Sequence, residues 1–186
     1  AGNHHSDQLH VVERLTRTHE GGRDEPWDVA DAPEPYIAGQ LKAIVGIARP
    51  TAGRALLHGT PVEAAQPDAR SLGVYIEPTG AHPGRSAHNH LRSLAALAGL
   101  PADRVDEVLQ LVGLAQAARR RVGTYSMGMR QRLGLAAALL GDPAILVLDE
   151  PLNGLDPQGI RWLRTFLRER AAAGGTVLLS SHVLTE

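Results

Sequence analysis

The sequence contains no cysteine, which excludes disulfide bonds, thiolate zinc sites and cysteine nucleophiles. It has no apolar run near the ~18 residues that span a bilayer. Its first ten residues have neither the basic nor the apolar region of a signal peptide. Because a cysteine-free chain suits a reducing compartment, we expect a cytoplasmic protein that reaches a membrane only through a partner.

An excess of charge of one sign is also missing, since 19 basic residues stand against 20 acidic ones and the formal net charge is -1. A nearly neutral chain has no global attraction for nucleic acid or an anionic membrane, so no nucleic-acid partner is expected. Its 186 residues and 43% hydrophobic content suffice for one sizeable core. Lysine is nearly absent, and the only one is Lys42.

The C-terminal half alternates short apolar runs with helical patterns. AILVLDE (residues 144–150) and TVLLSSH (176–182) are typical of strands buried on both faces of a parallel sheet. A helix over 157–172 lies between them and completes a strand–helix–strand unit. The sequence therefore predicts an α/β fold with parallel core strands.

Further elements are expected upstream of this unit. Apolar residues recur at helical spacing over 90–100 and 104–114, with Asp103 as the N-cap of the second helix. Ser126 caps a stronger helix that ends at Gly141. The remaining expected elements are a weak strand over 9–18, a helix over 37–48 and short strands over 54–62 and 71–77.

Polar residues that can do chemistry follow both predicted strands. In open α/β sheets, ligands bind beyond the carboxyl ends of the strands, where Asp149, Glu150 and His182 stand. A carboxylate such as Asp149 suits magnesium, Glu150 could activate a water, and His182 could contact a γ-phosphate. Taken singly, an acidic pair is often a solvated loop feature and a lone histidine is often structural. The combination with Pro151 and Asp156 is more specific.

These residues lie in AILVLDEPLNGLDPQG, which resembles the Walker B segment and D-loop (145–156) of ATP-binding cassette (ABC) ATPases. YSMGMRQRLGLAAALLGDP, just upstream, resembles the signature helix of that family (about 126–141), in the form found in bacterial exporters of drugs and peptide antibiotics. The resemblance implies that Asp149 binds metal, that Glu150 and His182 are catalytic, and that Asp156 is the D-loop aspartate. It further implies that Ser126 and Gly128 bind the γ-phosphate held by the opposite subunit of a dimer.

The resemblance covers most of residues 9–21 and 37–186. It places His19 where an aromatic residue stacks on adenine, and Glu77 where the Q-loop glutamine is common. The helices over about 85–122 resemble the helical subdomain that docks on a permease, although an ordinary helical insert with a solvated arginine run fits equally well. The implied protein is peripheral at the inner face of the cell membrane. Its partners would be a permease and a second ATP-binding subunit, in a homo- or heterodimer, and its cofactors ATP and Mg²⁺.

The phosphate loop of such an ATPase is missing. No G-x-x-x-x-G-K-[ST] motif, whose backbone N–H groups, lysine and hydroxyl hold the triphosphate and magnesium, occurs in the chain. Alignment of the helix at 37–48 with the family places Tyr36, Ile37 and Ala38 where Gly-Lys-Ser is required. The preceding DAPEP offers two prolines without N–H groups and a repelling carboxylate. Lys42 lies too far along the helix to substitute.

We therefore predict an incomplete P-loop NTPase, ABC ATPase-like, with a helical subdomain. Its parts are a ragged opening strand at 1–21, an irregular segment at 22–36 that replaces a deleted or frame-shifted phosphate-loop region, and the ATPase-like domain at 37–186. The leading function is an exporter's ATP-binding subunit that binds ATP poorly by itself. The alternatives are a non-hydrolytic subunit that lends its signature helix to a partner, and an inactive product of a damaged gene.

Overall fold

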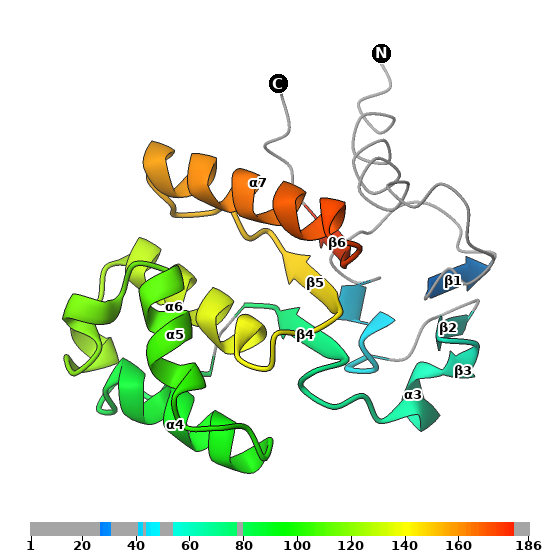
Figure 1. Ribbon diagram of the computed structural model, residues 1–186, viewed down its shortest axis with the longest axis horizontal. Helices are drawn as coiled ribbons and strands as arrows, with labels where there is room; N and C mark the ends of the chain where they lie inside the picture. The colour runs from blue at the N-terminus through cyan, green and yellow to red at the C-terminus, as the bar shows by residue number, and fades with distance from the viewer. Residues whose placement is uncertain (1–26, 31–40, 43, 49–53, 78–79, 181–186) are drawn as a thin grey trace.

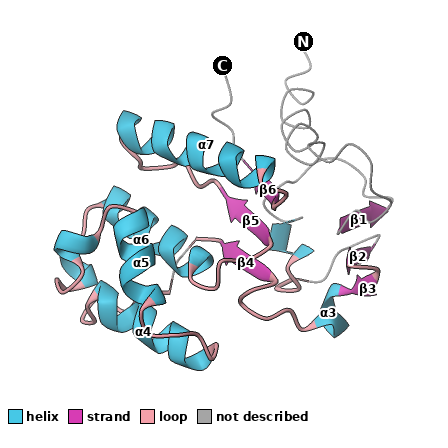
Figure 2. Cartoon of the chain, viewed as in Figure 1, coloured by secondary structure: helices cyan, strands magenta, loops and turns pink. Residues whose placement is uncertain are grey.

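The computed structural model describes residues 27–30, 41–42, 44–48, 54–77 and 80–180. This part of the chain contains two small sheets, one antiparallel with the order β1-β2-β3 and one parallel with the order β4-β5-β6. Figure 2 shows the parallel sheet between the antiparallel sheet at one end and helices α4 to α6 at the other. The elements are β1 (Trp27–Ala30), β2 (Arg54–Leu57), β3 (Thr60–Pro61), α3 (Val62–Ala65), β4 (Leu72–Tyr75), α4 (Ala87–Leu97), α5 (Arg104–Leu111), η1 (Ala115–Ala117), η2 (Val122–Thr124), α6 (Met127–Leu139), β5 (Ile145–Asp149), α7 (Pro157–Ala172) and β6 (Thr176–Ser180).

The predicted strand–helix–strand unit is confirmed. β5 and β6 are parallel, with Val147 opposite Leu178, and β4 pairs parallel with the other edge of β5. Helix α7 connects the two strands (Figure 1) and begins at Pro157, where a proline costs nothing because the first N–H of a helix has no partner. The chain is therefore α/β with a parallel sheet, as the apolar runs indicated.

Strand β5 separates two hydrophobic clusters because its side chains alternate between the two faces of the sheet. Leu146 and Leu148 belong to the larger cluster, which they share with α4 to α7. Ile145 and Val147 belong to the smaller one, with Leu41 and the β2–α3 region. All four of these β5 side chains are at most 2% exposed. The sheet is thus covered on both faces, which leaves its ends open for a site.

The antiparallel sheet differs from expectation in two ways. Residues 54–62 form a hairpin rather than one strand, because His58 and Gly59 both have positive φ values (50° and 75°) and turn the chain between β2 and β3. Strand β1 lies inside the segment 22–36 that was expected to be irregular, and it pairs antiparallel with β2. Four residues alternating Trp-Asp-Val-Ala are too short a pattern to outweigh the surrounding prolines and glycines.

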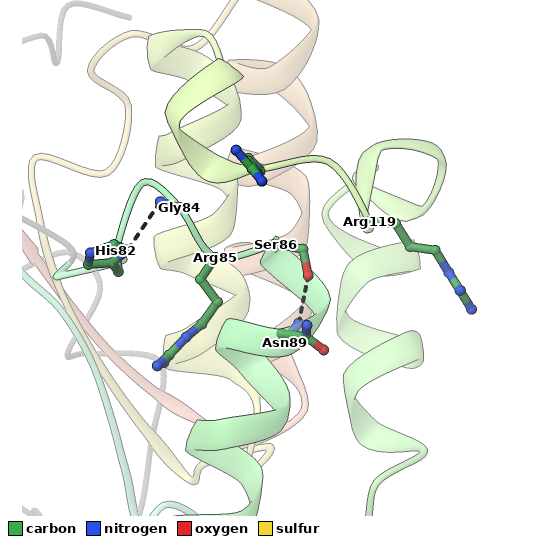
Figure 3. Close-up of a pocket in the computed structure, with 7 residues that line it drawn as sticks. His82, Gly84, Arg85, Ser86, Asn89 and Arg119 are labelled. Atoms are coloured by element: carbon green, nitrogen blue, oxygen red, sulfur yellow. Dashed lines mark hydrogen bonds between the residues drawn. The ribbon is translucent and has the colours of Figure 1, made fainter.

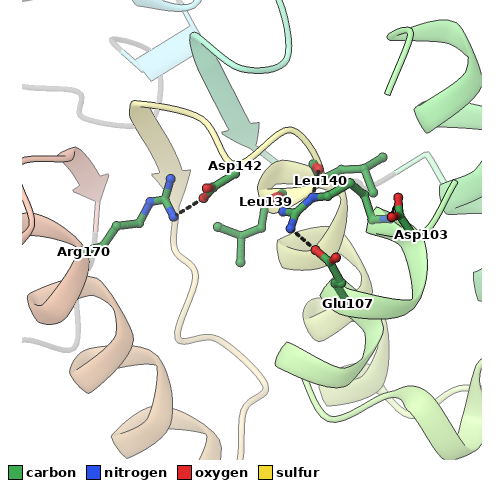
Figure 4. Close-up of polar contacts among 7 residues, drawn as sticks. Asp103, Glu107, Leu139, Leu140, Asp142 and Arg170 are labelled. Atoms are coloured by element: carbon green, nitrogen blue, oxygen red, sulfur yellow. Dashed lines mark hydrogen bonds and ion pairs between the residues drawn. The ribbon is translucent and has the colours of Figure 1, made fainter. Parts of the chain in front are cut away.

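Two arginines hold the end of α6 and the loop that leads from it into β5 (Figure 4). The Arg104 side chain at the start of α5 donates to the carbonyl oxygens of Leu140 (3.2 Å) and Leu139 (3.3 Å) at the end of α6. Arg170 in α7 pairs with Asp142 at 2.7 Å, directly before β5. Helix α6 ends at Leu139, two residues earlier than expected, and these bonds fix where it leads into β5.

Of the other elements predicted before β5, two helices are confirmed, one segment is described only in part and one lies outside the described residues. Helices α4 and α5 confirm the two amphipathic helices, and the Asp103 side chain accepts a hydrogen bond from the Arg104 N–H as a cap. Residues 41, 42 and 44 are helical and a turn follows, so the described part of the 37–48 segment is a helix end. The strand expected over 9–18 lies outside the described residues.

Candidate functional site

The carboxyl ends of β5 and β6 meet at Asp149 and Ser180, which are paired across the sheet. The Ser180 hydroxyl donates to the Asp149 carboxylate at 2.7 Å. The backbone N–H of Glu150 donates to the same hydroxyl at 3.0 Å and to the Ser180 carbonyl oxygen at 3.2 Å. Ser180 is 3% exposed, so one buried hydroxyl holds both predicted Walker B carboxylate residues in place.

Glu150 has a left-handed backbone with φ 48°, a conformation that costs a residue with a Cβ roughly 1–2 kcal/mol. Its carbonyl oxygen accepts hydrogen bonds from the Gln131 side-chain amide and the Asn153 N–H, both at 3.2 Å. Gln131 lies in α6 and is 1% exposed. The strained turn at the proposed catalytic carboxylate is therefore held from α6 as well as from β6.

Tyr75 and Glu77 lie at the same end of the sheet, where Tyr75 is the last residue of β4. The Tyr75 hydroxyl, on a side chain 2% exposed, donates to the Glu77 carboxylate at 3.3 Å. Burial raises the pKa of Tyr75 well above its ordinary value, and the negative charges of Glu77 and Asp149 raise it further. Tyr75 thus stays neutral and acts as a donor. The structure brings Glu77, Asp149 and Glu150 to the carboxyl ends of the parallel strands, the place that the sequence indicated for Asp149 and Glu150.

The predicted signature segment and D-loop are in contact. Ser126 caps α6, its hydroxyl accepting a hydrogen bond from the Met129 N–H at 3.2 Å, and its side chain is exposed. Gly128 faces Gly154 so closely that a Cβ added to Gly128 would lie 2.7 Å from the Gly154 carbonyl oxygen. The N-terminus of α6 is therefore both solvent-accessible and fixed against the D-loop.

Asp156 has a structural role at the start of α7. One of its carboxylate oxygens accepts hydrogen bonds from the Gly159 N–H (3.1 Å) and the Arg132 guanidinium (3.0 Å). The hydrogen bond from Gly159, followed by the bond and charge of Arg132, keeps the pKa of Asp156 below its ordinary value. Arg132 also donates to the Val112 carbonyl oxygen at 3.2 Å. Asp156 thus ties α7 to α6, and its contact with a nucleotide stays a prediction.

Other proposed site residues lie outside the described part of the chain, namely His19, His182 and the residues aligned with the phosphate loop, 36–38. Sequence reasoning missed Tyr75, Gln131 and Ser180 as supports of the site. The signal for Ser180 was a polar residue at the end of an apolar strand, because a buried polar residue requires a partner, whereas Gln131 is flanked by two arginines and carries no such signal.

The carboxylates fit only part of what magnesium–ATP requires. Protein-bound Mg²⁺ takes one or two carboxylates and completes its shell with waters and substrate phosphates. Asp149, with Glu150 beside it, suits that mode, and no group of three or more metal-ligating side chains occurs within the described ranges. The phosphates need a cradle of N–H donors and a lysine, and the sequence has no such motif. The carboxylates are therefore suited to a magnesium ion, whereas the sequence has no motif that would hold the triphosphate.

Replacing Ser180 with alanine should lower the free energy of unfolding by about 1–3 kcal/mol, because the Asp149 carboxylate loses its hydroxyl donor and the Glu150 N–H keeps only its bond to the carbonyl oxygen of residue 180. Ser180→Thr keeps the hydroxyl and serves as the matched control. Urea denaturation of the two variants measures the difference. A loss below about 0.5 kcal/mol in Ser180→Ala would show that the hydroxyl does not hold the two residues.

No helix in the described part of the chain is both long and apolar enough to cross a membrane.

Comparison with known families and proteins agrees with this geometry. Residues 40–153 match the family model described as ABC transporter, and residues 3–49 match a second model described as "Putative FMN-binding domain". The ABC match begins after the segment assigned to an opening strand, so the assignments of 1–21 and 22–36 stay predictions.

Curated relatives include the uncharacterized ABC transporter ATP-binding protein YhcH of Bacillus subtilis (strain 168), 39% identical over 78% of this chain and 49% of that protein. The bacitracin transport ATP-binding protein BcrA of Enterococcus faecalis is 40% identical over 78% of this chain and 48% of its own length. The lantibiotic transport ATP-binding protein SrtF of Streptococcus pyogenes is 35% identical over 78% and 63%. The chain thus spans about half to two thirds of these relatives.

A solved structure of an ATP binding subunit of an ABC transporter superimposes with a TM-score of 0.67 at 27% identity, over 79% of this chain and 65% of that one. Its likeness extends the agreement from sequence to fold. Since the ABC transporter model matches more than half of the residues, this chain belongs to the ABC transporter family, and its curated relatives are ATP-binding proteins of that family.

Proposed function

We propose that the chain works as the ATP-binding subunit of an ABC exporter, with a membrane permease and a second ATP-binding subunit, at the inner face of the cell membrane. The observation that carries this proposal is the carboxylate pair Asp149–Glu150, which Ser180 and Gln131 hold at the carboxyl end of β5. The names of BcrA and SrtF, a bacitracin transport and a lantibiotic transport ATP-binding protein, support transport as the process. The transported substrate would be set by the permease.

Each residue has a proposed part in that function. Magnesium–ATP, when bound, would supply the phosphoryl group and the charge that polarises it. Asp149 would ligate the metal, Glu150 would orient a water, and His182 would contact the γ-phosphate. Ser126 and Gly128, at the exposed N-terminus of α6, would bind a phosphate held by the second subunit, since a helix N-terminus favours anions.

The chain's own nucleotide binding is proposed to be impaired because its phosphate loop has been replaced. The match to the ABC transporter model starts at residue 40, and residues 3–49 match the model of a different family. The region expected to carry the phosphate loop therefore lies outside the ABC match. Resequencing of the encoding locus tests this origin. An intact phosphate-loop motif in another reading frame would support a frameshift, whereas a clean in-frame sequence would exclude one.

The purified chain alone should show no magnesium-dependent ATP hydrolysis above background, because the triphosphate has no cradle to hold its γ-phosphate beside Glu150. A steady-state phosphate-release assay with an intact relative, run in parallel, measures this. Turnover within about tenfold of the intact relative, abolished by Glu150→Gln, would refute the impairment while confirming the role of Glu150.

A non-hydrolytic role is the second candidate, and the preserved N-terminus of α6 favours it. Ser126 is exposed and still caps the helix, and Gly128 still fits against Gly154. These features serve a nucleotide on a partner subunit rather than one on this chain. A subunit that lends them would activate a competent partner without hydrolysing ATP itself. An inactive gene product, the third candidate, would do neither.

A further inference from the structure

The sulfur atoms of the chain are confined to the first turn of α6. The chain has no cysteine and two methionines, Met127 and Met129, and both lie in the predicted signature segment. Cysteine thiolates and methionine thioethers are the sulfur groups that oxidants attack in proteins. Any oxidation of sulfur in this chain therefore takes place at the start of α6.

The two methionines differ in their access to solvent. Met127 is the first residue of α6 and is 53% exposed. Met129 is only partly exposed, because it packs against the large hydrophobic cluster that α6 shares with α4, α5 and α7. A small oxidant dissolved in water therefore reaches the thioether of Met127 more easily than that of Met129.

The serine cap of α6 does not by itself expose the residue that follows it. Helix α4 begins in the same way, since the Ser86 hydroxyl accepts a hydrogen bond from the Asn89 N–H at 3.2 Å (Figure 3). Ser126 caps α6 at the same distance. The residue after Ser86 is Ala87, which is 0% exposed. The exposed thioether is thus a feature of α6 and not of serine-capped helices in general.

The Met127 side chain lies along Gly154 in the predicted D-loop. A Cβ added to Gly154 would lie 2.9 Å from the Cγ of Met127 and 3.1 Å from both its Sδ and its Cε. Gly154 has a φ of 71° and stands between the buried Leu152 and Leu155, which anchor the loop in the core. Met127 therefore makes an apolar contact with a fixed loop while it stays open to solvent.

Oxidation of Met127 would change this contact and its surroundings. A sulfoxide is polar, and its oxygen carries a partial negative charge. It would weaken the apolar contact with Gly154. It would also place negative charge beside Ser126 and Gly128, the neighbours of Met127 that are proposed to bind a partner's γ-phosphate. Like charges repel, so the oxidised segment should bind phosphate less well.

We propose that Met127 is a reversible oxidation site, at which hydrogen peroxide converts the thioether to a sulfoxide. A lone pair of the sulfur attacks one peroxide oxygen, so an S–O bond forms while the O–O bond breaks. The sulfur loses two electrons, and the departing hydroxide takes the proton of the transferred oxygen and leaves as water. Methionine sulfoxide reductases reverse the change. The chemistry of this site is independent of nucleotide binding, whereas its effect on a partner subunit rests on the proposed function.

Timed treatment of the purified chain with hydrogen peroxide tests the site, with fragment-ion mass spectrometry to resolve the two methionines within one peptide. In the folded chain Met127 should be oxidised at least about fivefold faster than Met129, because access to solvent governs the rate. In urea the two rates should agree within about twofold, since the fold no longer protects Met129. Reductases specific for each sulfoxide epimer, supplied with dithiothreitol, should then restore the Met127 thioether.

The effect on a partner is measured by adding the treated chain, freed of peroxide, to an intact related ATP-binding subunit. Oxidation should lower the stimulation of that subunit's ATPase at least about threefold, and the reductases should restore it. Met127→Leu keeps an apolar side chain against Gly154 and should make the stimulation insensitive to peroxide. Met129→Leu is the matched control and should leave it sensitive. Thermal unfolding shows whether both variants are folded.

The contrary results separate the two parts of the proposal. Equal oxidation rates of Met127 and Met129 in the folded chain would overturn the oxidation site. Complete oxidation of Met127 with unchanged stimulation would overturn its effect on the partner. An untreated chain that gives no stimulation would instead refute the donated signature, and the ratio of the two oxidation rates would still decide whether Met127 is the oxidation site.

Discussion

Mixing the purified chain with an intact related ATP-binding subunit should raise that subunit's ATPase rate by roughly tenfold or more, and Ser126→Asp should abolish the increase. Preorganised donors aimed at a developing charge are often worth about 100-fold each in rate. Ser126 presents such a donor at the exposed N-terminus of α6. A carboxylate in its place would repel the partner's γ-phosphate across the interface.

The choice of aspartate separates function from folding. Aspartate is as good an N-cap as serine, so Ser126→Asp should keep the bond to the Met129 N–H and the stability of α6. Ser126→Thr keeps both the cap and the hydroxyl and should preserve most of the stimulation. Ser126→Arg should also abolish it, with some loss of stability from the missing cap. Stimulation by Ser126→Asp equal to that of the parent chain would rule out a donated signature.

Gly73→Ala should destabilise the chain by about 3 kcal/mol or more. A Cβ at this position in β4 would lie 2.2 Å from the Ala138 carbonyl oxygen and 2.6 Å from the Pro143 side chain. The first of these atoms is backbone at the end of α6, which Arg104 holds in place, so it cannot yield cheaply. Overpacking of this kind costs about 1–3 kcal/mol, and more where the backbone must move.

The matched control is Gly99→Ala, which has open space around its Cβ and a φ of 63°. It should cost only the strain of a left-handed backbone, about 1 kcal/mol. Urea denaturation of both variants gives the two free energies. Because Gly73 lies in a strand and has no left-handed strain of its own, equal losses would show that the close approach of β4 to α6 is relieved at little cost, which would contradict the prediction.

The parallel sheet could be predicted from sequence because its information is local. The runs that became β5 and β6 contain four and three consecutive apolar residues, and the helix between them begins at an Asp-Pro pair. The carboxylate pair was also predictable, since the end of such a strand is where ligands bind. Local pattern and tertiary fold agree in this half of the chain.

The supports of the site could not be predicted, because they depend on contacts between distant residues. Gln131 reaches Glu150 across 19 positions in the sequence, and Ser180 reaches it across 30. The hairpin at His58 and Gly59 was missed for a different reason, since the turn lacks the Asn-Gly or Asp-Gly pair that most strongly marks a two-residue hairpin loop. Strand β1 pairs with β2, and its four residues are too few to show a recognisable alternation of apolar and polar residues.

Equilibrium binding of ATP to the purified chain, with magnesium and without a partner, tests the central claim most directly. Titration calorimetry beside an intact related subunit is the measurement. We predict that the intact subunit binds and that this chain shows no saturable binding at millimolar ATP, although its parallel sheet is folded. Saturable, magnesium-dependent binding that Asp149→Asn weakens at least about tenfold would contradict the account, because it would mean that the chain holds the triphosphate by groups other than a phosphate loop.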